Sequence, residues 1–292
     1  MALNVSGPVV NPAPCAHGAH RSAARRVVAL ALAALVAVGA ASCGKKDAKV
    51  AVGSAEADRV LYDRGMAALD NKKWLTAREY FRQIVDNYQQ SPLRADSKLG
   101  LADTYLGEGT TQAFVLAINE YREFLSFFPT HPRADYAQYK LALCHYRQMA
   151  KAQRDQTETR EAITEFQVLF EKYPQSTLVP AARTRYRDAR DRLSDSEYGV
   201  GYFYYRQKWY PGAIDRFQSL LKVDPEYSRR DAAYFHLGES LVSMNRQAEA
   251  LPWFERVVTE FSQSEYLAEA QKRVAALRAT PAPQQAPSPP GP

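Results

Sequence analysis

The sequence is poor in cysteine, with 3 in 292 residues. Cys15 and Cys43 fall in a terminal region that we expect to be removed or modified, which leaves Cys144 as the one thiol of the remaining chain. A single thiol cannot form an internal disulfide, so a disulfide-stabilised fold is excluded and stability must come from packing. Cys144, within YKLALCHY, is expected to be a small buried apolar residue.

Catalytic and cofactor motifs are missing as well. The chain has five histidines but no HExxH pair, no Cys/His set in metal-ligand spacing, no Walker motif and no GxSxG. Cys144 and His145 are adjacent, so on a helix their side chains point about 100° apart. GVGYFY lacks the third glycine of a dinucleotide-binding loop. We therefore predict that the protein is not an enzyme and has no cofactor and no metal site.

Strong charge of one sign is absent once the first residues are set aside. The formal net charge is +6, but residues 1–43 carry three arginines and no acidic residue, so the remainder nets +3. No basic block occurs in that remainder. This mild excess of positive charge predicts no nucleic-acid partner.

The sequence has one marked apolar run, Val27 to Gly39, which is too short for a comfortable transmembrane helix. Arg25 and Arg26 precede it and AASC, ending at Cys43, follows it, an arrangement typical of an export signal. AASC resembles a bacterial lipobox, which predicts a signal peptide over 1–42 and a lipid on Cys43. The alternative is ordinary secretion with soluble release. By the same resemblance, Gly44 implies an outer-membrane protein that faces the periplasm and contacts the membrane only through its lipid.

A repeat runs through the rest of the chain. An alanine is followed four residues later by an aromatic ring in five places: Ala77/Phe81, Ala117/Tyr121, Ala162/Phe166, Ala213/Phe217 and Ala250/Phe254. Glycine stands twelve residues before three of these alanines, and proline twelve residues after three of them. Small residues let two antiparallel helices approach closely, the ring fills the gap between them, and the proline ends the second helix. Five helix-turn-helix units of this kind match the tetratricopeptide repeat.

The sequence therefore predicts an all-α fold, a tetratricopeptide-repeat superhelix of five units with a C-terminal helix from about Glu265 to Arg278. Between Leu178 and Tyr205 no turn cluster occurs, which predicts one long helix joining repeats 1–3 to repeats 4–5. Two shorter helices meeting near Ser194 are the alternative. Serines at the repeat ends are expected to be helix N-caps: Ser91, Ser176, Ser228 and Ser264.

These features divide the chain into five segments. We expect the signal peptide over 1–42, a flexible tether over 43–57, repeats 1–3 over 58–177, and repeats 4–5 with the long connecting helix and the capping helix over 178–278. Residues 279–292 are rich in proline and are expected to be disordered.

Stacked helical repeats form a concave surface that usually binds peptides or proteins. In repeats 1–3 the register places one set of residues on that side, a client-peptide groove: Arg59, Tyr62, Met66, Asp96, Asp103, Tyr136, Tyr139 and Tyr146. The aromatic stretch of 199–217 is helical rather than a strand or a membrane belt, because it fits the repeat. It places Tyr198, Tyr202 and Tyr205 on the inner face of the long helix. Burial of some of these rings against the next repeat is the alternative.

Two stretches of sequence identify a family more specifically than the general repeat positions do. They are FPTHPRADYAQY at 128–139 and DRLSDSEYGVGYFYYRQKWYPGAIDRF at 191–217. With the lipobox and five repeats, they make residues 43–278 resemble the BamD family, tetratricopeptide-repeat lipoproteins of the outer-membrane β-barrel assembly complex. The resemblance implies that repeats 1–3 recognise C-terminal segments of unfolded outer-membrane proteins. It also implies that repeats 4–5 dock a BamA-like barrel subunit through its POTRA domains.

In that family a helix-borne arginine is implicated in the docking, and Arg216 in AIDRF matches it. The alternative for Arg216 is an ordinary surface arginine paired with Asp215 or Glu197. The proline-rich tail and the insertion GEGTT depart from the family and leave accessory assembly lipoproteins open as partners. The competing interpretation is another tetratricopeptide envelope lipoprotein that scaffolds cell-wall or division factors.

Overall fold

The computed structural model describes residues 56–279, and within that range the chain is helical throughout with short connections. The expected signal peptide, Cys43, almost all of the tether and nearly all of the tail lie outside the described residues. The helices are α2 (Ala57–Asp70), α3 (Trp74–Asn87), α4 (Arg94–Glu108), α5 (Thr111–Phe127), α6 (Ala134–Gln148), α7 (Thr157–Lys172), α8 (Val179–Arg206), α9 (Tyr210–Val223), α10 (Arg230–Ser243), α11 (Gln247–Glu260) and α12 (Leu267–Ala279).

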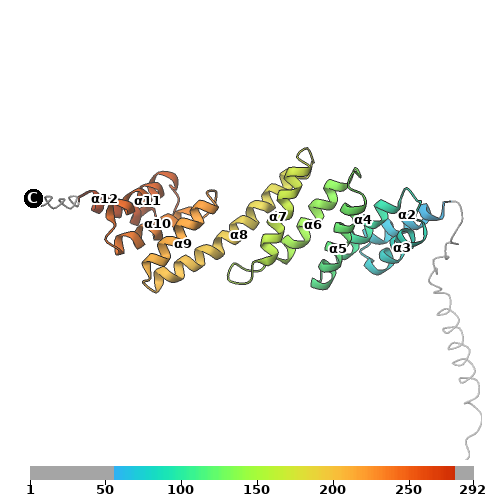
Figure 1. The fold of residues 1–292 in the computed structure, drawn as a ribbon, viewed down its shortest axis with the longest axis horizontal. Helices are drawn as coiled ribbons and strands as arrows, with labels where there is room; N and C mark the ends of the chain where they lie inside the picture. Colours follow the sequence, from blue (N-terminus) through green and yellow to red (C-terminus); the bar gives the residue numbers. More distant parts are fainter. Residues whose placement is uncertain (1–55, 280–292) are drawn as a thin grey trace, which may run out of the picture. The chain divides into compact units, whose positions relative to one another are not determined.

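Successive helices pack side by side in chain order, α2 with α3, α4 with α5, and so on to α12 (Figure 1). Each alanine and ring of the repeat pattern is fully buried. A Cβ built on Gly65 would lie 2.7 Å from the ring of Phe81, and one on Gly201 would lie 2.7 Å from the ring of Phe217. Only glycine permits so close an approach of the helices. The predicted all-α tetratricopeptide fold is confirmed.

The long connecting helix is also confirmed. α8 spans 28 residues from Val179 to Arg206 without a break, so the alternative of two helices meeting near Ser194 is wrong. Ser194 lies inside the helix, and its hydroxyl donates to Asp224 at 2.6 Å. The C-terminal helix α12 begins at Leu267, two residues after the expected start.

The predicted serine N-caps are wrong, because α4, α8, α10 and α12 begin two or three residues after each serine. Three of the four hydroxyls still accept from the backbone N–H two residues on. Each serine hydroxyl also donates to an aspartate near the start of an earlier helix or, for Asp191, within α8. The pairs are Ser91 with Asp58, Ser176 with Asp135, Ser228 with Asp191 and Ser264 with Asp231. This recurring Ser–Asp pair ties each of these turns to the preceding repeat, a contact between repeats that a local capping rule could not predict.

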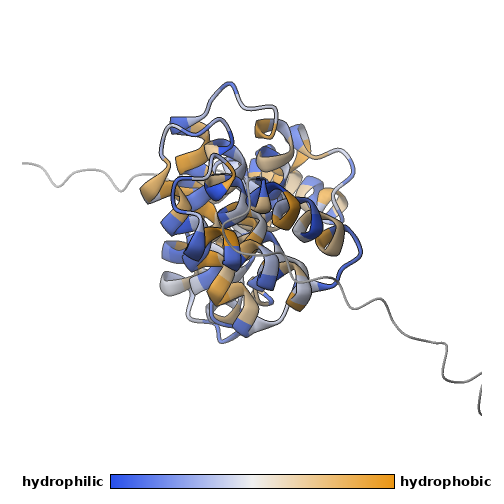
Figure 2. Cartoon of the chain, turned by 90° about the vertical axis from the view of Figure 1, so that its right-hand side faces the viewer, coloured by the Kyte–Doolittle hydropathy of each residue, from blue (hydrophilic) through white to orange (hydrophobic). Residues whose placement is uncertain are grey.

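Two hydrophobic cores lie along the described chain, and α8 contributes to both. The first extends from α2 to Ala182 near the start of α8. The second extends from Tyr198, in the last third of α8, to Ala270 in α12. Apolar and hydrophilic residues alternate along the helices (Figure 2). Among residues 56–279, no helix combines the length and the apolar character needed to cross a membrane.

Candidate binding surfaces

The predicted groove residues of repeats 1–3 come from α2, α4 and α6, the first helix of each pair. On α2, Arg59 is exposed and its Nε lies 3.2 Å from a carboxylate oxygen of Asp63. Tyr62 is half-buried, with its ring edge-on to Phe81 at 6.0 Å between centroids. Met66 is also half-buried and packs against the first core. These three side chains therefore form one face of α2 that combines apolar surface with a charge.

Asp103 of α4 is the polar centre of this region. It accepts hydrogen bonds from the hydroxyls of Tyr121, at 2.5 Å, and Tyr136, at 2.9 Å. Burial raises the pKa of the Asp103 carboxyl against the opposing effect of these hydrogen bonds. Burial, with the nearby Asp103 charge, likewise raises the pKa of Tyr136. The Tyr136 hydroxyl is therefore a neutral, fixed donor in this structure.

The ring of Tyr136 is flanked by cations. The guanidinium of Arg133 lies 4.6 Å from the ring centroid, and the Nζ of Lys140 lies 5.0 Å from it. Arg133 also donates to Asp96 of α4 at 3.1 Å. Asp96 and Asp103 thus belong to one network that links the second and third repeats, and positive charge surrounds it on α6.

Tyr139 is a correction to the predicted groove. Its side chain is 8% exposed and packs near Phe166, with ring centroids 6.4 Å apart, so Tyr139 belongs to the core. α6 turns this side chain toward α7, and the ring is buried within its own repeat. Tyr146 lies seven residues, about two turns, further along α6, and its hydroxyl donates to Asp188 of α8 at 2.6 Å. Tyr146 therefore joins the third repeat to the long helix while remaining partly accessible.

In the second half, the tyrosines of α8 gather around His236 of α10. The ring centroids of Tyr202 and Tyr205 lie 5.0 Å and 5.1 Å from the imidazole centroid. Burial lowers the pKa of His236, which keeps the imidazole neutral. Its Nδ1 lies 2.8 Å from the carbonyl of Ala232, and a carbonyl can only accept, so Nδ1 carries the proton. The motif search had not singled out His236, because its partners are aromatic rings rather than metal ligands.

Tyr198 is the second correction. It was predicted to face a partner, but it is 8% exposed and lies within the second core. Its ring stacks on Tyr202 at 5.9 Å and contacts Phe217 at 5.6 Å. Tyr202 and Tyr205 are half-buried, so of the three predicted tyrosines these two retain accessible surface.

Arg216 lies on α9 between residues that are buried against α8. Its side chain is 45% exposed, and Nη1 lies 3.9 Å from a carboxylate oxygen of Glu197, which is itself 43% exposed. This separation is at the outer limit of an ion pair, so the guanidinium remains accessible to other carboxylates. Beside it lies a surface pocket between α7, α8 and α9. Its lining includes Arg160, Arg190, Leu193, Glu197, Leu220 and Val223.

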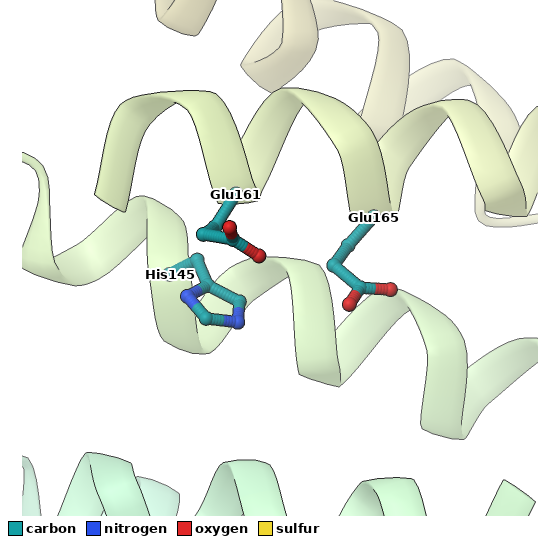
Figure 3. Close-up of side chains that lie close together, drawn as sticks. All are labelled: His145, Glu161 and Glu165. Carbon is teal, nitrogen blue, oxygen red and sulfur yellow. The ribbon is translucent and has the colours of Figure 1, made fainter. Parts of the chain in front are cut away.

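The structure also brings together three side chains that the motif search did not connect. Within residues 56–279, His145 of α6 and Glu161 and Glu165 of α7 each offer a ligand atom, and these atoms lie within 4.8 Å of one another (Figure 3). The sequence contained a partial signal, because Glu161 and Glu165 are four apart on a helix. Cys144 next to His145 is fully buried, and burial raises the pKa of its thiol to about 12. The prediction that Cys144 is a small buried residue is confirmed.

Comparison with known proteins places these observations in a family. Residues 54–241 match the family model YfiO, described as an outer membrane lipoprotein. The chain is 28% identical over 219 residues to the outer membrane protein assembly factor BamD of Caulobacter vibrioides, covering 75% of this chain and 71% of that protein. It is 26% identical over 176 residues to the BamD of Vibrio cholerae, covering 57% of this chain and 72% of that protein. Among solved structures, the chain aligns with a TPR2AB-domain:pHSP90-complex of yeast Sti1 at a TM-score of 0.42 and 11% identity, over 76% of this chain and 83% of that one.

Proposed function

The chain belongs to the YfiO family of outer membrane lipoproteins, and we propose that it is a non-enzymatic scaffold for the assembly of outer membrane proteins. Its curated relatives carry that role in their name, outer membrane protein assembly factor. A scaffold needs accessible side chains of mixed character on a rigid frame rather than a reactive centre. The described helices offer two such surfaces, one in each half of the repeat array.

The first surface is the client surface, defined as Arg59, Tyr62, Met66, Tyr136 and Tyr146. Its function is to hold the C-terminal, aromatic-ending segments of unfolded outer-membrane proteins. The observation that carries this proposal is the half-exposed state of the tyrosine and methionine side chains on the first helices of the repeats. Arg59, with Arg133 and Lys140 beside Tyr136, supplies positive charge for a peptide carboxylate.

The second surface is the docking surface, defined as Tyr202, Tyr205 and Arg216. Its function is to hold a barrel subunit through its soluble POTRA domains. Arg216 supports this proposal because its stem is anchored beside buried Phe217 while its guanidinium is only loosely held by Glu197. A guanidinium presents a fixed fork of donors that matches a partner carboxylate.

Membrane attachment completes the proposal, with a lipid on Cys43 holding the protein at the periplasmic face of the outer membrane. A Cys43→Ser variant is expected to lose its acyl label and to accumulate as precursor or soluble protein. Unchanged fractionation and labelling of this variant would contradict the anchor alone and would leave the assembly role in place.

Co-purification from solubilised membranes tests the proposed function most broadly. Recovery of a β-barrel subunit with POTRA domains is the expected result. Recovery of cell-wall or division factors without such a subunit would favour the competing interpretation, a different envelope scaffold. Accessory lipoproteins stay open as further partners, which the same experiment would identify.

A further inference from the structure

The third repeat contains a histidine with an unused nitrogen. His145 of α6 is 5% exposed, and its Nδ1 lies 2.8 Å from a carboxylate oxygen of Glu158 at the start of α7. Among the described residues, nothing hydrogen-bonds to its buried Nε2. A buried polar atom without a partner is costly, so its presence calls for a ligand.

Two further carboxylates lie close to the imidazole of His145. Glu161 and Glu165 project from successive turns of α7, and Figure 3 shows their carboxylates on the same side of α7 as the imidazole. A ring nitrogen of His145 and one oxygen from each glutamate lie within 4.8 Å of one another. The Glu161 side chain is 46% exposed and that of Glu165 is 14% exposed, so the cluster opens to solvent on the Glu161 side.

Glu158 gives the imidazole the orientation that metal-binding histidines have. A carboxylate that accepts from Nδ1–H fixes the proton on Nδ1 and leaves the Nε2 lone pair free to bind a cation. Carboxylate–histidine pairs of this kind support histidine ligands in zinc sites. One imidazole nitrogen and two carboxylates suit a divalent transition-metal ion, with water as a further ligand.

We propose that His145, Glu161 and Glu165 form a binding site for a divalent transition-metal ion such as Zn²⁺, with Glu158 as the residue that positions His145. Neighbouring ligands of a tetrahedral zinc ion lie about 3.4 Å apart, so ligand atoms that are up to 4.8 Å apart must close in by up to about 1.4 Å. The exposed side chain of Glu161 has the freedom to do so. The ion would join α6 to α7 within the third repeat.

A neighbouring cation provides a sharp test of this site. Nη2 of Arg122 on α5 lies 3.3 Å from Glu165 and 3.9 Å from Glu161. Arg122 therefore offsets part of the negative charge that a metal ion would use, while the other Glu165 oxygen accepts from Gln138 Nε2 at 2.7 Å. If the glutamates bind a metal ion, replacing Arg122 should strengthen metal binding. If Arg122 only makes a structural contact, its replacement should not strengthen it.

The experiment is a calorimetric titration of the full chain with Zn²⁺, with Mg²⁺ titrated in parallel. We expect His145→Gln and Glu165→Gln to lose one bound zinc per chain or to weaken its binding at least tenfold, and Glu158→Gln to weaken it about tenfold. Arg122→Gln should tighten zinc binding several-fold. Glu171→Gln, at an exposed glutamate of the same helix, is the matched control and should bind as the unaltered protein does.

Thermal unfolding in the absence of metal shows that each variant is folded, and zinc should raise the Tm of the unaltered protein but not of His145→Gln. Equal zinc stoichiometry and affinity in the unaltered protein and in Glu165→Gln would overturn the proposal. Failure of the unaltered protein to bind zinc, or weaker binding by Arg122→Gln, would overturn it as well. None of these results depends on the assembly role, so the two proposals fail separately.

Discussion

The two halves of the repeat array hold their inner tyrosines by different chemistry. In the first half the hydroxyls bind carboxylates, as Tyr136 and Tyr121 bind Asp103 and as Tyr146 binds Asp188. In the second half the rings of Tyr198, Tyr202 and Tyr205 pack around the neutral imidazole of His236, and the Tyr198 hydroxyl lies 3.1 Å from its Nδ1. The same tetratricopeptide frame therefore holds inner tyrosines through carboxylates in one half and through ring packing around an imidazole in the other.

This difference fits the two kinds of partner in the proposed function. Charged groups near a few aromatic rings suit short peptides that are bound and released, because such contacts are partly solvated. A cluster of packed rings with accessible arginines near it suits a lasting interface, where aromatic residues and arginine contribute most of the binding energy. Substitutions that act on one half at a time test whether the two halves differ in this way.

The largest expected effects come from the buried rings of the repeat pattern. Phe81→Ala and Phe217→Ala should each destabilise the protein by about 3–5 kcal/mol, because each ring fills the close approach of two helices. Since repeats contact mainly their neighbours, amide hydrogen exchange should accelerate in α2–α5 for the first variant and around α8–α10 for the second. Equal acceleration of exchange throughout the described helices in both variants would show that the two halves unfold as one cooperative unit.

The next largest loss of stability is expected where the end of α9 contacts α8, between the two halves. Asp224, at the end of α9, has a side chain 3% exposed and accepts from Arg187 and Ser194 of α8. Asp224→Ala leaves these donors unpaired and should cost about 2–3 kcal/mol in urea unfolding, below the range for fully buried pairs because Arg187 is partly exposed. Asp215→Asn, on the exposed side of the same helix, is the control and should change little.

The same contact predicts a pH dependence. Burial alone would raise the pKa of Asp224, but the hydrogen bonds from Arg187 and Ser194 outweigh it and lower that pKa. A lowered pKa in the folded state means that the stabilisation is present above about pH 4 and is lost as the pH falls through the folded value. The difference in unfolding free energy between the unaltered protein and Asp224→Ala should therefore shrink at acid pH. A constant difference from pH 7 to pH 2 would contradict the ionic role of Asp224.

Removal of single hydroxyl groups should give the smallest effects and the clearest contrast between the halves. Tyr136→Phe deletes a hydrogen bond to the Asp103 carboxylate and should cost about 1–2 kcal/mol. Tyr202→Phe keeps the ring that stacks on Tyr198 and Tyr205, so it should cost less than about 0.5 kcal/mol. Equal costs in chemical unfolding would mean that the two halves use their tyrosines alike.

The sequence predicted the frame well because its signals are local. The spacing of alanine, ring, glycine and proline depends on helix geometry alone, and the absence of turn residues before Tyr205 was enough to predict α8. The side-chain partners were less predictable. Tyr139 and Tyr198 occupy the same helix face as accessible tyrosines, yet each is buried by a neighbouring helix. The sequence does not reveal how closely that neighbouring helix packs.

The same reasoning explains the two histidines that the motif search passed over. His145 meets glutamates thirteen or more residues away on α7, and His236 meets rings from α8, more than thirty residues earlier. Both groupings are produced by packing between helices. The serines at the repeat ends show the same limit, since their aspartate partners lie in the preceding repeat.

The central claim is that the client surface and the docking surface act separately, and one paired measurement tests it directly. Tyr62→Ala and Arg216→Glu are compared for binding of an aromatic-ending peptide and for recovery of the barrel subunit, with folding checked by circular dichroism. Tyr62→Ala should weaken peptide binding about thirtyfold, the effect of losing about 2 kcal/mol at a hot spot, and should retain the barrel subunit. Arg216→Glu should bind the peptide normally and lose the barrel subunit through charge repulsion. Normal recovery of the barrel subunit with Arg216→Glu, or peptide binding unaffected by Tyr62→Ala, would contradict the account.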